Sequence, residues 1–550
     1  MTALLTDNLS LLAGAPNGIK KLRELILELA VRGKLVPQDP SDEPASELLN
    51  LLITEARDTT GRGKAKRQAL PEVCESEQPY ILPNGWAWGR LGDVTEILDS
   101  LRRPVTKQDR KPGPYPYYGA SGVVDYVSAY IFDEPLVLVG EDGAKWGVGE
   151  RTAFSITGKT WVNNHAHVLR PKRDAVCDDY LVISLTAQDL SQFITGMTVP
   201  KLNQARLTSI GIPLPPLAEQ HRIVAKVDEL MALCDRLEAQ QADAESAHAL
   251  LVQALLHSLT QATDAEDFAA SWQRLAEHFH TLFTTEPSID ALKQTLLQLA
   301  VMGKLVPQDP GDEPASELLK RITEEKARLV AEGKLKKQKP LAEIAEVEKS
   351  FELPEKWEWV RLEEIAQVGT GATPLRTNPK YFEPATINWV TSGETSQDHI
   401  HATEQKVSPL ALMETNLTVY PPHTLVIAMY GQGKTRGQIS ELLINACTNQ
   451  ACAAIQLFDQ DESHRRYVKY FFVKSYDDIR LLAAGGAQPN LNLGKIKETV
   501  LPLAPATEQH RIVAKVDQLM ALCDQLKNRL TKARQLNEQL TTSLVEQAVA

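Results

Sequence analysis

Basic side chains gather in one short stretch of the chain. It holds Arg102, Arg103, Lys107, Arg110 and Lys111, with only Asp109 opposing them. Such a run favours phosphate groups as ligands, because binding a polyanion needs a local basic surface rather than a basic chain. The plain alternative is a solvated face. The formal net charge of −12 argues only mildly against a nucleic acid as the ligand.

A second chemical candidate is a phosphate-loop pattern. Ala428 is followed by Gly433, Lys434 and Thr435 at the required spacing. A phosphate loop needs a glycine-rich turn and then a helix whose first amides cradle the phosphates. Here Gly437 follows closely, no amphipathic helix begins, and no apolar strand ends in an aspartate for Mg²⁺. We therefore expect no nucleotide site, and an NTPase remains an alternative.

Other catalytic constellations are incomplete. His165 and His167 alternate and could share one face of a strand, but no paired cysteine or carboxylate ligand lies near them in sequence. An adenine methyltransferase needs an Asn/Asp-Pro-Pro-aromatic loop, and Tyr420-Pro-Pro-His423 has the wrong flanks. Glu324 and Glu325 belong to a charged helical stretch. We expect no catalytic residue and no metal site, with a methyltransferase or a nuclease as the alternative.

The length and composition of the chain limit the classes of protein to which these candidates can belong. The chain has 550 residues, enough for three or four domains. No run approaches the roughly 18 apolar residues of a membrane span. The first twenty residues lack a secretory signal pattern, and the six cysteines show no C-x-x-C pairing. These features predict an intracellular, cytoplasmic protein with reduced thiols and no membrane partner.

The segments that would position these side chains occur twice in the sequence. Gly33 to Leu49 recurs as Gly303 to Leu319 with one difference, Ser41 against Gly311. The segment from Leu82 to Leu91 resembles that from Leu353 to Leu362, and Glu219 to Leu237 recurs almost unchanged as Glu508 to Leu526. This is a duplication on the scale of domains, and two equivalent units of one chain usually pack about a pseudo-two-fold axis.

The repeated segments have helical patterns. The third segment begins after Pro215 and carries a heptad seam in each copy, which we expect to continue for about forty residues. The two long helices should pack against each other. The first segment predicts a helix over Ile19 to Val31 capped by Gly33, with a copy over Leu292 to Val301 capped by Gly303; the material from Gln240 to Ile289 is also helical in pattern. The seam positions are Ile223, Val227, Leu230, Cys234, Leu237, Leu251 and Leu255, then Ile512, Val516, Leu519, Cys523, Leu526, Leu530, Ala533, Asn537, Leu540 and Leu544, with His248 and Asn537 as polar interruptions.

Between the repeated segments lie two inserts, about Gly85 to Gly211 and Lys356 to Val500, that are rich in glycine, proline, aromatic and β-branched residues. We predict strands at Tyr126 to Phe132, Leu136 to Val139, Thr386 to Val390 and Leu425 to Met429. The inserts are related: Asn164-His165-Ala166 aligns with Asn449-Gln450-Ala451, and both inserts close on Pro-x-Leu-Asn, at Pro200 to Asn203 and Pro489 to Asn492. Asn203 and Asn492 should stabilise turns, and the run Tyr115, Tyr117, Tyr118 should pack.

The predicted fold class is α+β. It has two mixed α/β domains separated by long antiparallel coiled-coil helices, with a pseudo-two-fold internal duplication. The predicted regions are a helical region over residues 1–80, a first insert domain over 81–212, a central helical region over 213–350, a second insert domain over 351–501 and a long helix over 502–550.

The paired motifs resemble a known family. The motifs are the Leu-Pro-x-x-Trp-x-Trp openings of the inserts, their Pro-x-Leu-Asn closings, and the Pro-Leu-x-x-x-x-Glu-Gln-His-Arg-Ile-Val-Ala-Lys-Val-Asp segments that begin at Pro213 and Pro502. Over nearly the whole chain this order resembles the specificity subunit of a type I restriction–modification enzyme. The resemblance implies two target-recognition domains, each reading one half of a bipartite double-stranded DNA target, and helices that set the spacing of the halves.

The resemblance also implies partners and residue roles. The chain would have no activity or cofactor of its own and would dock two methyltransferase subunits, which use S-adenosylmethionine. Restriction subunits would supply ATP- and Mg-dependent translocation and cleavage. For DNA we favour Arg102, Arg103, Lys107, Lys145, Asn163, Asn164, His165 and His167 in the first insert, and Gln432, Lys434, Arg436, Gln438, Asn449 and Gln450 in the second. For docking we favour Glu219, Gln220, Arg222, Lys226, Glu508, Gln509, Arg511 and Lys515.

Two alternatives remain for these assignments. Any single polar residue among the DNA candidates could instead stabilise a turn or form a hydrogen bond with a polar group of the core. The whole chain could instead be a coiled-coil scaffold that carries two adhesion-like β modules. Salt-dependent DNA binding would separate that scaffold from a DNA-reading subunit.

Overall fold

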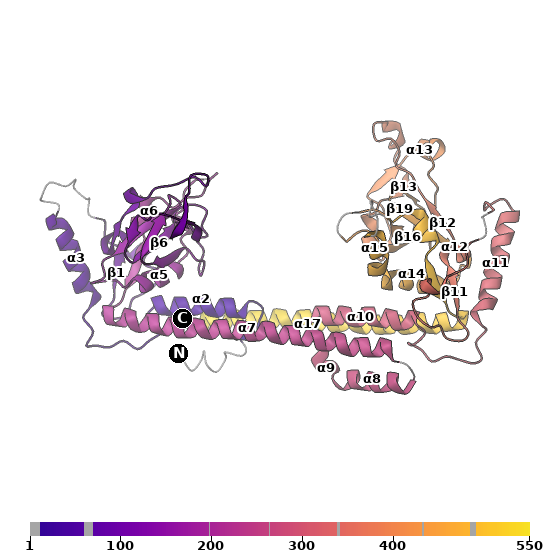
Figure 1. Cartoon of the computed structure of the whole chain (residues 1–550), viewed down its shortest axis with the longest axis horizontal. Helices are drawn as coiled ribbons and strands as arrows, with labels where there is room; N and C mark the ends of the chain where they lie inside the picture. Colours follow the sequence, from indigo (N-terminus) through magenta and orange to yellow (C-terminus); the bar gives the residue numbers. More distant parts are fainter. Residues whose placement is uncertain are drawn as a thin grey trace. The chain divides into compact units, whose positions relative to one another are not determined.

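The computed structural model of the chain describes residues 12–59, 70–196, 198–262, 265–337, 341–431, 434–484 and 491–549. The chain divides into two compact units. The first comprises residues 1–246 and 532–550, and the second comprises residues 247–531. Each unit combines helices with β-sheets, so the expected α+β class is confirmed (Figure 1).

In the first unit the helices and strands are α2 (Gly18–Val31), α3 (Ala45–Thr59), β1 (Ala87–Arg90), α4 (Leu91–Val94), β2 (Thr95–Ile97), β3 (Pro112–Gly119), β4 (Gly122–Val127), β5 (Phe132–Asp133), β6 (Leu136–Gly140), β7 (Ala153–Ile156), β8 (Lys159–Val162), β9 (Ala166–Pro171), α5 (Asp178–Thr186), α6 (Gln204–Thr208) and β10 (Gly211–Leu214). Helix α7 (Leu217–Gln261) begins in this unit and ends in the second.

The second unit contains α8 (Ala265–Glu277), α9 (Phe279–Leu282), α10 (Glu286–Val301), α11 (Ala315–Ala331), β11 (Glu358–Arg361), α12 (Leu362–Ile365), β12 (Ala366–Thr370), β13 (Ile387–Val390), β14 (His399–Ile400), β15 (Gln405–Val407), α13 (Pro409–Glu414), β16 (Leu425–Ala428), β17 (Ile439–Leu442), β18 (Cys447–Thr448), β19 (Cys452–Leu457), α14 (Glu462–Lys474), α15 (Tyr476–Ala484), α16 (Leu493–Lys497) and β20 (Val500–Leu503). Helix α17 (Ala506–Val549) begins here and ends in the first unit.

The short repeated helix ends as its sequence predicts. Helix α2 buries the apolar side chains that recur every three or four residues, among them Leu22, Leu25 and Leu29. Gly33 follows in the left-handed region with φ 67°, and the amide of Lys34 donates to the carbonyl of Leu29 at 2.9 Å. This is the closing geometry that favours glycine after a helix. Gly303 repeats it after α10, with φ 71°.

The two long helices run for 45 and 44 residues, or about 65 Å each at 1.5 Å per residue. The first part of each predicted seam is correct, since Ile223, Val227 and Cys234 are buried, as are their repeats. Its continuation is wrong at three positions in the later parts of the helices: Leu251, Ala533 and Leu540 are exposed. In α17 the buried position is Thr541. In a straight helix, positions seven residues apart are rotated by about 20° relative to each other, so over several heptads the buried face moves from one heptad position to the neighbouring one.

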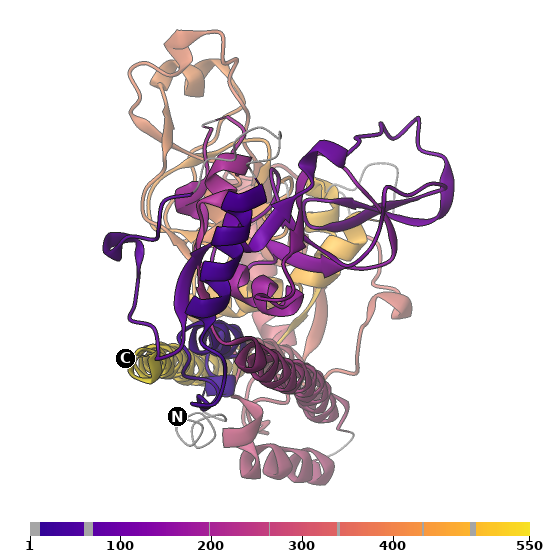
Figure 2. The ribbon, with the colours of Figure 1, turned by 90° about the vertical axis from the view of Figure 1, so that its left-hand side faces the viewer.

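Helix α2 packs against both long helices within the first unit, and Figure 2 shows it between the start of α7 and the end of α17. Arg23 forms an ion pair of 2.6 Å with Asp235 of α7, and Lys21 donates to the hydroxyl of Thr542 of α17 at 3.0 Å. The second unit repeats the first of these contacts, between Lys293 of α10 and Asp524 of α17. The repeated segments therefore make equivalent contacts in the two units.

The two inserts fold into related domains, here called the first insert domain (residues 87–214) and the second insert domain (residues 358–503). The first has two four-stranded sheets, in the orders β2-β9-β6-β7 and β4-β3-β8-β5. The second has sheets in the orders β12-β19-β16-β17-β14 and β15-β13-β18. Strands β6 and β16 are fully buried at corresponding places. Both domains also contain a parallel pair, β3 with β8 and β13 with β18.

Three of the four strand predictions are confirmed, by β6, β13 and β16. The prediction for Tyr126 to Phe132 is wrong, because β4 ends at Val127 and β5 begins only at Phe132. Between them the amide of Ser128 donates to Lys111 and that of Ile131 to Thr160, so the chain bends between two different partners. The β-branched and aromatic residues there line two short strands rather than one.

The alignment of the inserts is off by one residue near the end of each domain. The amide of Asn163 donates to the carbonyl of Tyr118, and its side chain accepts from the amide two residues later. Asn449 makes the same two contacts, with Val390 and with the amide of Ala451. Asn163, not Asn164, is therefore the counterpart of Asn449.

Both ends of each insert domain meet in a two-stranded antiparallel ribbon, β1 with β10 and β11 with β20. The domain thus leaves and rejoins the helical part at one place. Among the described residues, no helix combines the length and apolar character that a membrane crossing requires.

Candidate nucleic-acid interface

The three repeated segments meet at one carboxylate in each unit. In the first unit Trp86 donates from its indole to Glu219 at 3.0 Å, and the Gln38 amide donates to the other oxygen of Glu219 at 3.2 Å. Trp86 precedes β1, Gln38 follows α2 and Glu219 lies in the first turn of α7. Glu219 is buried, and this burial raises the pKa of its carboxyl. The contact fixes the base of the insert domain to the helices.

The second unit repeats this contact. Trp357 donates to Glu508 at 2.8 Å and Gln308 donates at 2.6 Å, and burial raises the pKa of Glu508 as well. Arg222 pairs with Asp42 at 2.6 Å in the first unit, and Arg511 pairs with Asp312 in the second.

These contacts change the assignment of the residues predicted to dock partners. Glu219, Gln220, Glu508 and Gln509 are each at most 1 % exposed and are hydrogen-bonded within the chain. Their side chains therefore cannot form a docking surface in this conformation. At these four positions the identity of the two copies goes with equivalent contacts inside each unit. Arg222 and Arg511 are paired but partly exposed, Lys226 is partly exposed beside Glu229, and Lys515 is exposed.

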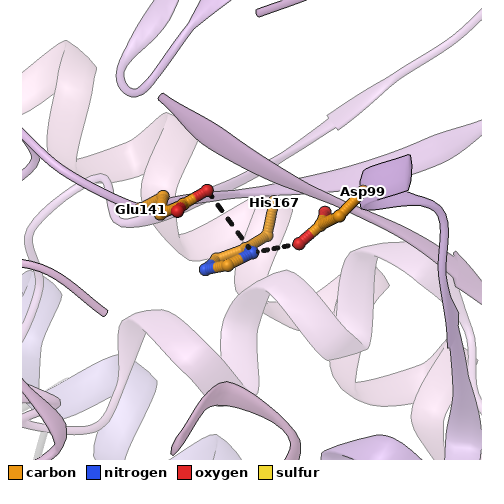
Figure 3. Close-up of side chains that lie close together, drawn as sticks. All are labelled: Asp99, Glu141 and His167. Carbon is orange, nitrogen blue, oxygen red and sulfur yellow. Dashed lines mark hydrogen bonds and ion pairs between the residues drawn. The ribbon is translucent and has the colours of Figure 1, made fainter. Parts of the chain in front are cut away.

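A charged cluster lies inside the first insert domain (Figure 3). Asp99, Glu141 and His167 bring one ligand-type atom each within 4.8 Å of one another. The imidazole Nδ1 of His167 lies 2.6 Å from Asp99 and 3.8 Å from Glu141. Lys201 binds Glu141 at 2.7 Å, and Arg102 forms ion pairs with both carboxylates. The two acids are thus neutralised by cations of the chain itself.

This cluster is better suited to structure than to holding a metal ion. The second nitrogen of His167, Nε2, lies 2.7 Å from the carbonyl oxygen of Leu202. Both ring nitrogens of His167 thus already lie against oxygen atoms of the chain, and a metal ion would have to displace one of these contacts. A divalent cation would also have to displace Arg102 and Lys201 from their carboxylates.

The cluster also corrects two candidate DNA contacts. His167 is 1 % exposed and both of its ring nitrogens are occupied. The guanidinium of Arg102 is held by Asp99, by Glu141 and, at 2.8 Å, by the carbonyl of Ala166. Neither side chain is free for DNA in this conformation. Sequence reasoning missed Asp99 and Glu141, which lie far from His167 along the chain.

Apart from Asn163, the other candidates of the first insert domain lie at the surface. Arg103, Lys107 and Lys145 are exposed, with Lys145 at 3.7 Å from Glu150. Asn164 and His165 are exposed in the turn between β8 and β9. Asn163, in the same turn, is buried.

A cavity of about 770 Å³ opens at this turn. The end of β3 with the turn and first residues of β4 that follow it, the residues after β6, Arg151 with part of β7, and the turn before β9 line it. Asn163 and His165 therefore share a concave surface with Asp142 and with Arg151, a residue that no motif of the sequence indicates.

The candidates of the second insert domain lie on two loops. Lys434, Arg436 and Gln438 connect β16 to β17, and Asn449 and Gln450 precede β19. The carbonyls of Lys434 and Arg436 accept from Tyr476 and Arg480, which ties this loop to α15. Lys434 and Gln450 are exposed, Arg436, Gln438 and Asn449 are half-buried, and Gln432 lies outside the described residues.

The phosphate-loop alternative fails on this geometry. Strand β17 begins at Ile439, so the residues after Lys434 enter a strand rather than the helix that a phosphate loop needs. Asn203 and Asn492 have the predicted local role, because each caps a short helix by accepting from a backbone amide at 2.9 Å, that of Arg206 and of Lys495.

The sequence is similar to known proteins over most of its length. The family model described as "Type I restriction modification DNA specificity domain" matches residues 83–245 and 354–535. The chain is 36 % identical over 575 residues to the specificity subunit of the type I restriction enzyme EcoAI of Escherichia coli, covering 97 % of this chain and 94 % of that one. The specificity subunit of EcoEI, also of Escherichia coli, is 36 % identical over 572 residues with the same coverage. The crystal structure of the HsdS subunit from Thermoanaerobacter tengcongensis aligns with a TM-score of 0.41 at 19 % identity, covering 86 % of this chain and 99 % of that one.

Proposed function

Because this chain belongs to the family of type I restriction–modification specificity subunits, we propose that its two insert domains each read one half of a bipartite double-stranded DNA target. The observation that carries this proposal is that the two insert domains are anchored to the helices in the same way but present different side chains in equivalent turns. Trp86 and Trp357 anchor the two domains through the same hydrogen bond to a helical carboxylate. The turn after Asn163 continues with Asn164 and His165, whereas the turn after Asn449 continues with Gln450 and Ala451.

The surface chemistry of the first insert domain supports this function. Arg103, Lys107 and Lys145 are exposed cations that can contact phosphates. The exposed Asn164 and His165 are of the types that contact base edges. In the second domain the corresponding contacts would come from Lys434, Arg436, Gln438, Asn449 and Gln450.

We further propose that the long helices dock two methyltransferase subunits, and through them the restriction subunits. Exposed leucines lie beside each other on each long helix, Leu250 with Leu251 on α7 and Leu536 with Leu540 one turn apart on α17, and such neighbouring apolar side chains favour a protein partner. Arg222, Lys226, Arg511 and Lys515 would lie at the margins of such contacts. S-adenosylmethionine, ATP and Mg²⁺ would be used by the partner subunits, the chain itself would be non-catalytic, and the assembly would act on DNA in the cytoplasm.

The proposal is tested with the full chain purified alone and together with its methyltransferase subunits. The complex should methylate adenines within one interrupted sequence, mapped on plasmid DNA, and the chain alone should transfer no methyl group. Binding of the complex to a duplex with that sequence should weaken steeply with salt. Binding insensitive to both salt and sequence would favour the scaffold alternative, and turnover by the pure chain would overturn the non-catalytic role.

A further inference from the structure

The cavity of the first insert domain presents one strong hydrogen-bond donor and one acceptor at the same opening. We propose that this cavity reads a single G·C base pair in the major groove, with Arg151 on the guanine edge and His165 on the amino group of the cytosine. This inference rests on the proposed function and adds to it the base pair and the two side chains that select it.

The cavity is built so that a base edge can enter it. The rings of Tyr118 and Phe154, with centroids 5.9 Å apart, line it, and the turn between β3 and β4 forms part of its rim. Gly122 in that turn has φ 138°, and a side chain at its place would meet nothing within 4 Å. The turn therefore leaves open space at this part of the rim.

His165 is held in one tautomer. Its Nδ1 lies 2.5 Å from a carboxylate oxygen of Asp142. An ionised carboxylate can only accept, so Nδ1 carries the proton, and in the neutral imidazole Nε2 is left as an acceptor. The ring is also fixed in position, because the His165 amide donates to Asn163 at 2.8 Å and its carbonyl accepts from Glu141 at 2.8 Å. Within the described part of the chain, Nε2 has no hydrogen-bond partner, and the side chain is 53 % exposed.

Arg151 supplies the donors. Its guanidinium lies over the ring of Phe154, 5.4 Å from the centroid, which orients the plane of the group. The residue is exposed, and no carboxylate of the described residues forms an ion pair with it. The guanidinium fork matches O6 and N7 of guanine, which are both acceptors.

The combination selects a G·C pair among the four possibilities. In the major groove a G·C pair offers two adjacent acceptors on guanine and one donor on cytosine, whereas an A·T pair offers an acceptor, a donor and a second acceptor. Arg151 satisfies the first two positions and Nε2 of His165 satisfies the third. Asn163 is buried, and its Oδ1 accepts from the His165 amide, so its side chain helps to hold His165 in place. In the second insert domain alanine replaces the imidazole at Ala451, so that domain lacks the same acceptor.

The test uses the full chain in complex with its methyltransferase subunits, and its readout is the set of methylated sequences from a library randomised across the target. Arg151→Ala and His165→Ala should relax the preference at one and the same G·C position, by roughly 5- to 150-fold each. Arg151→Lys should keep overall affinity and weaken that preference less than Arg151→Ala does, because lysine can donate to guanine but lacks the planar fork. Asp142→Asn should relax the preference at the same position, because the carboxylate that fixes the tautomer of His165 is then absent. Lys159→Ala, on β8 of the same domain, is the matched control and should leave every position unchanged.

Each other result overturns the inference. If Arg151→Ala and His165→Ala leave all preferences intact, or relax two different positions, the cavity does not read one base pair. If Arg151→Ala weakens binding equally on every sequence and flattens the salt dependence, Arg151 is a phosphate contact. Failure of the unaltered complex to methylate any specific sequence would instead contradict the proposed function, so the two failures are distinguishable.

Discussion

The indole nitrogen of Trp86 lies 3.0 Å from a carboxylate oxygen of Glu219, and the equivalent atoms of Trp357 and Glu508 lie 2.8 Å apart. Each pair joins residues more than a hundred positions apart in sequence and closes the base of one insert domain on a long helix. The same bond therefore recurs in both units, although the insert sequences that it anchors differ.

Replacing Glu219 with alanine should destabilise the first unit. The change leaves the buried indole N–H of Trp86 without an acceptor, which costs roughly 1–3 kcal/mol, and the loss should appear as a lower urea midpoint followed by tryptophan fluorescence. Glu229→Gln is the matched control, because Gln518 stands at that position in the second copy; its effect should stay within about 0.5 kcal/mol. Equal effects of the two variants would contradict the role given to Glu219.

The ion pair between Arg90 and Glu77 should make the stability of the first insert domain depend on acid. The Arg90 guanidinium, 2.6 Å away, lowers the pKa of Glu77 to about 2. A carboxyl whose pKa is lowered by folding stabilises the fold above its unfolded pKa of about 4.5, and this contribution is lost as the pH falls towards 2. Because the Glu77 side chain is 45 % exposed, we expect roughly 1 kcal/mol.

The measurement compares urea midpoints of the unaltered chain and Glu77→Gln. The difference should be present at pH 6 and should shrink as the pH falls from 4.5 to 3. A difference independent of pH would show that the pair contributes nothing through its charge.

The exposed cations of the first insert domain should contribute to binding without selecting sequence. In the full complex, Arg103→Ala combined with Lys107→Ala should weaken binding about equally on all sequences. It should also reduce the slope of log Kd against log salt by about two, one for each phosphate that is no longer neutralised. A changed base preference with an unchanged slope would contradict a phosphate role.

Arg102, the neighbour of Arg103, should behave differently. Its removal leaves the carboxylates of Asp99 and Glu141 with one cation fewer inside the domain, and breaking buried pairs of this kind costs roughly 3–5 kcal/mol. We therefore expect Arg102→Ala to lower the thermal midpoint of the first insert domain, with Arg103→Ala as the control that leaves it unchanged. Normal stability together with a reduced salt slope would return Arg102 to the set of phosphate contacts.

Exchanging residues 87–214 for the corresponding residues of a relative should change one half of the DNA target only. The ends of this segment are paired in register, Ala87 with Leu214 and Arg90 with Gly211, so a replacement with the same ribbon can rejoin the helices without altering their path. Methylated-base mapping of the exchanged complex gives the result. Changes in both halves would mean that the two domains do not read independently.

Much of the scaffold could be predicted from the sequence because its signals are local or repeated. Gly33 follows a helix that it caps, and Asn203 sits where a short helix begins, so one residue and its neighbours suffice. The phase of the long seam could not be predicted past Leu530, since a small rotation per heptad accumulates until Thr541, not Leu540, is buried.

The candidate site was harder to predict, because its contacts join distant segments. Nothing near His167 in sequence indicates that Asp99 and Glu141 enclose it, and its type alone suggested a base contact. Identity between repeats likewise does not say what a side chain faces: Glu219 and Glu508 suggested a docking surface, but each is buried against a tryptophan of its own unit.

The division of the chain has a consequence for its synthesis on the ribosome. Leu544, Val545 and Ala548 of α17 pack against the core of the first unit, which also contains α2, although α17 follows every other described element of that unit along the chain. During synthesis, part of the helical core of the first unit therefore stays uncovered until α17 has been made. A message that ends early would yield a first unit with that gap left open, and such a nascent chain would be a natural substrate for chaperones and proteases.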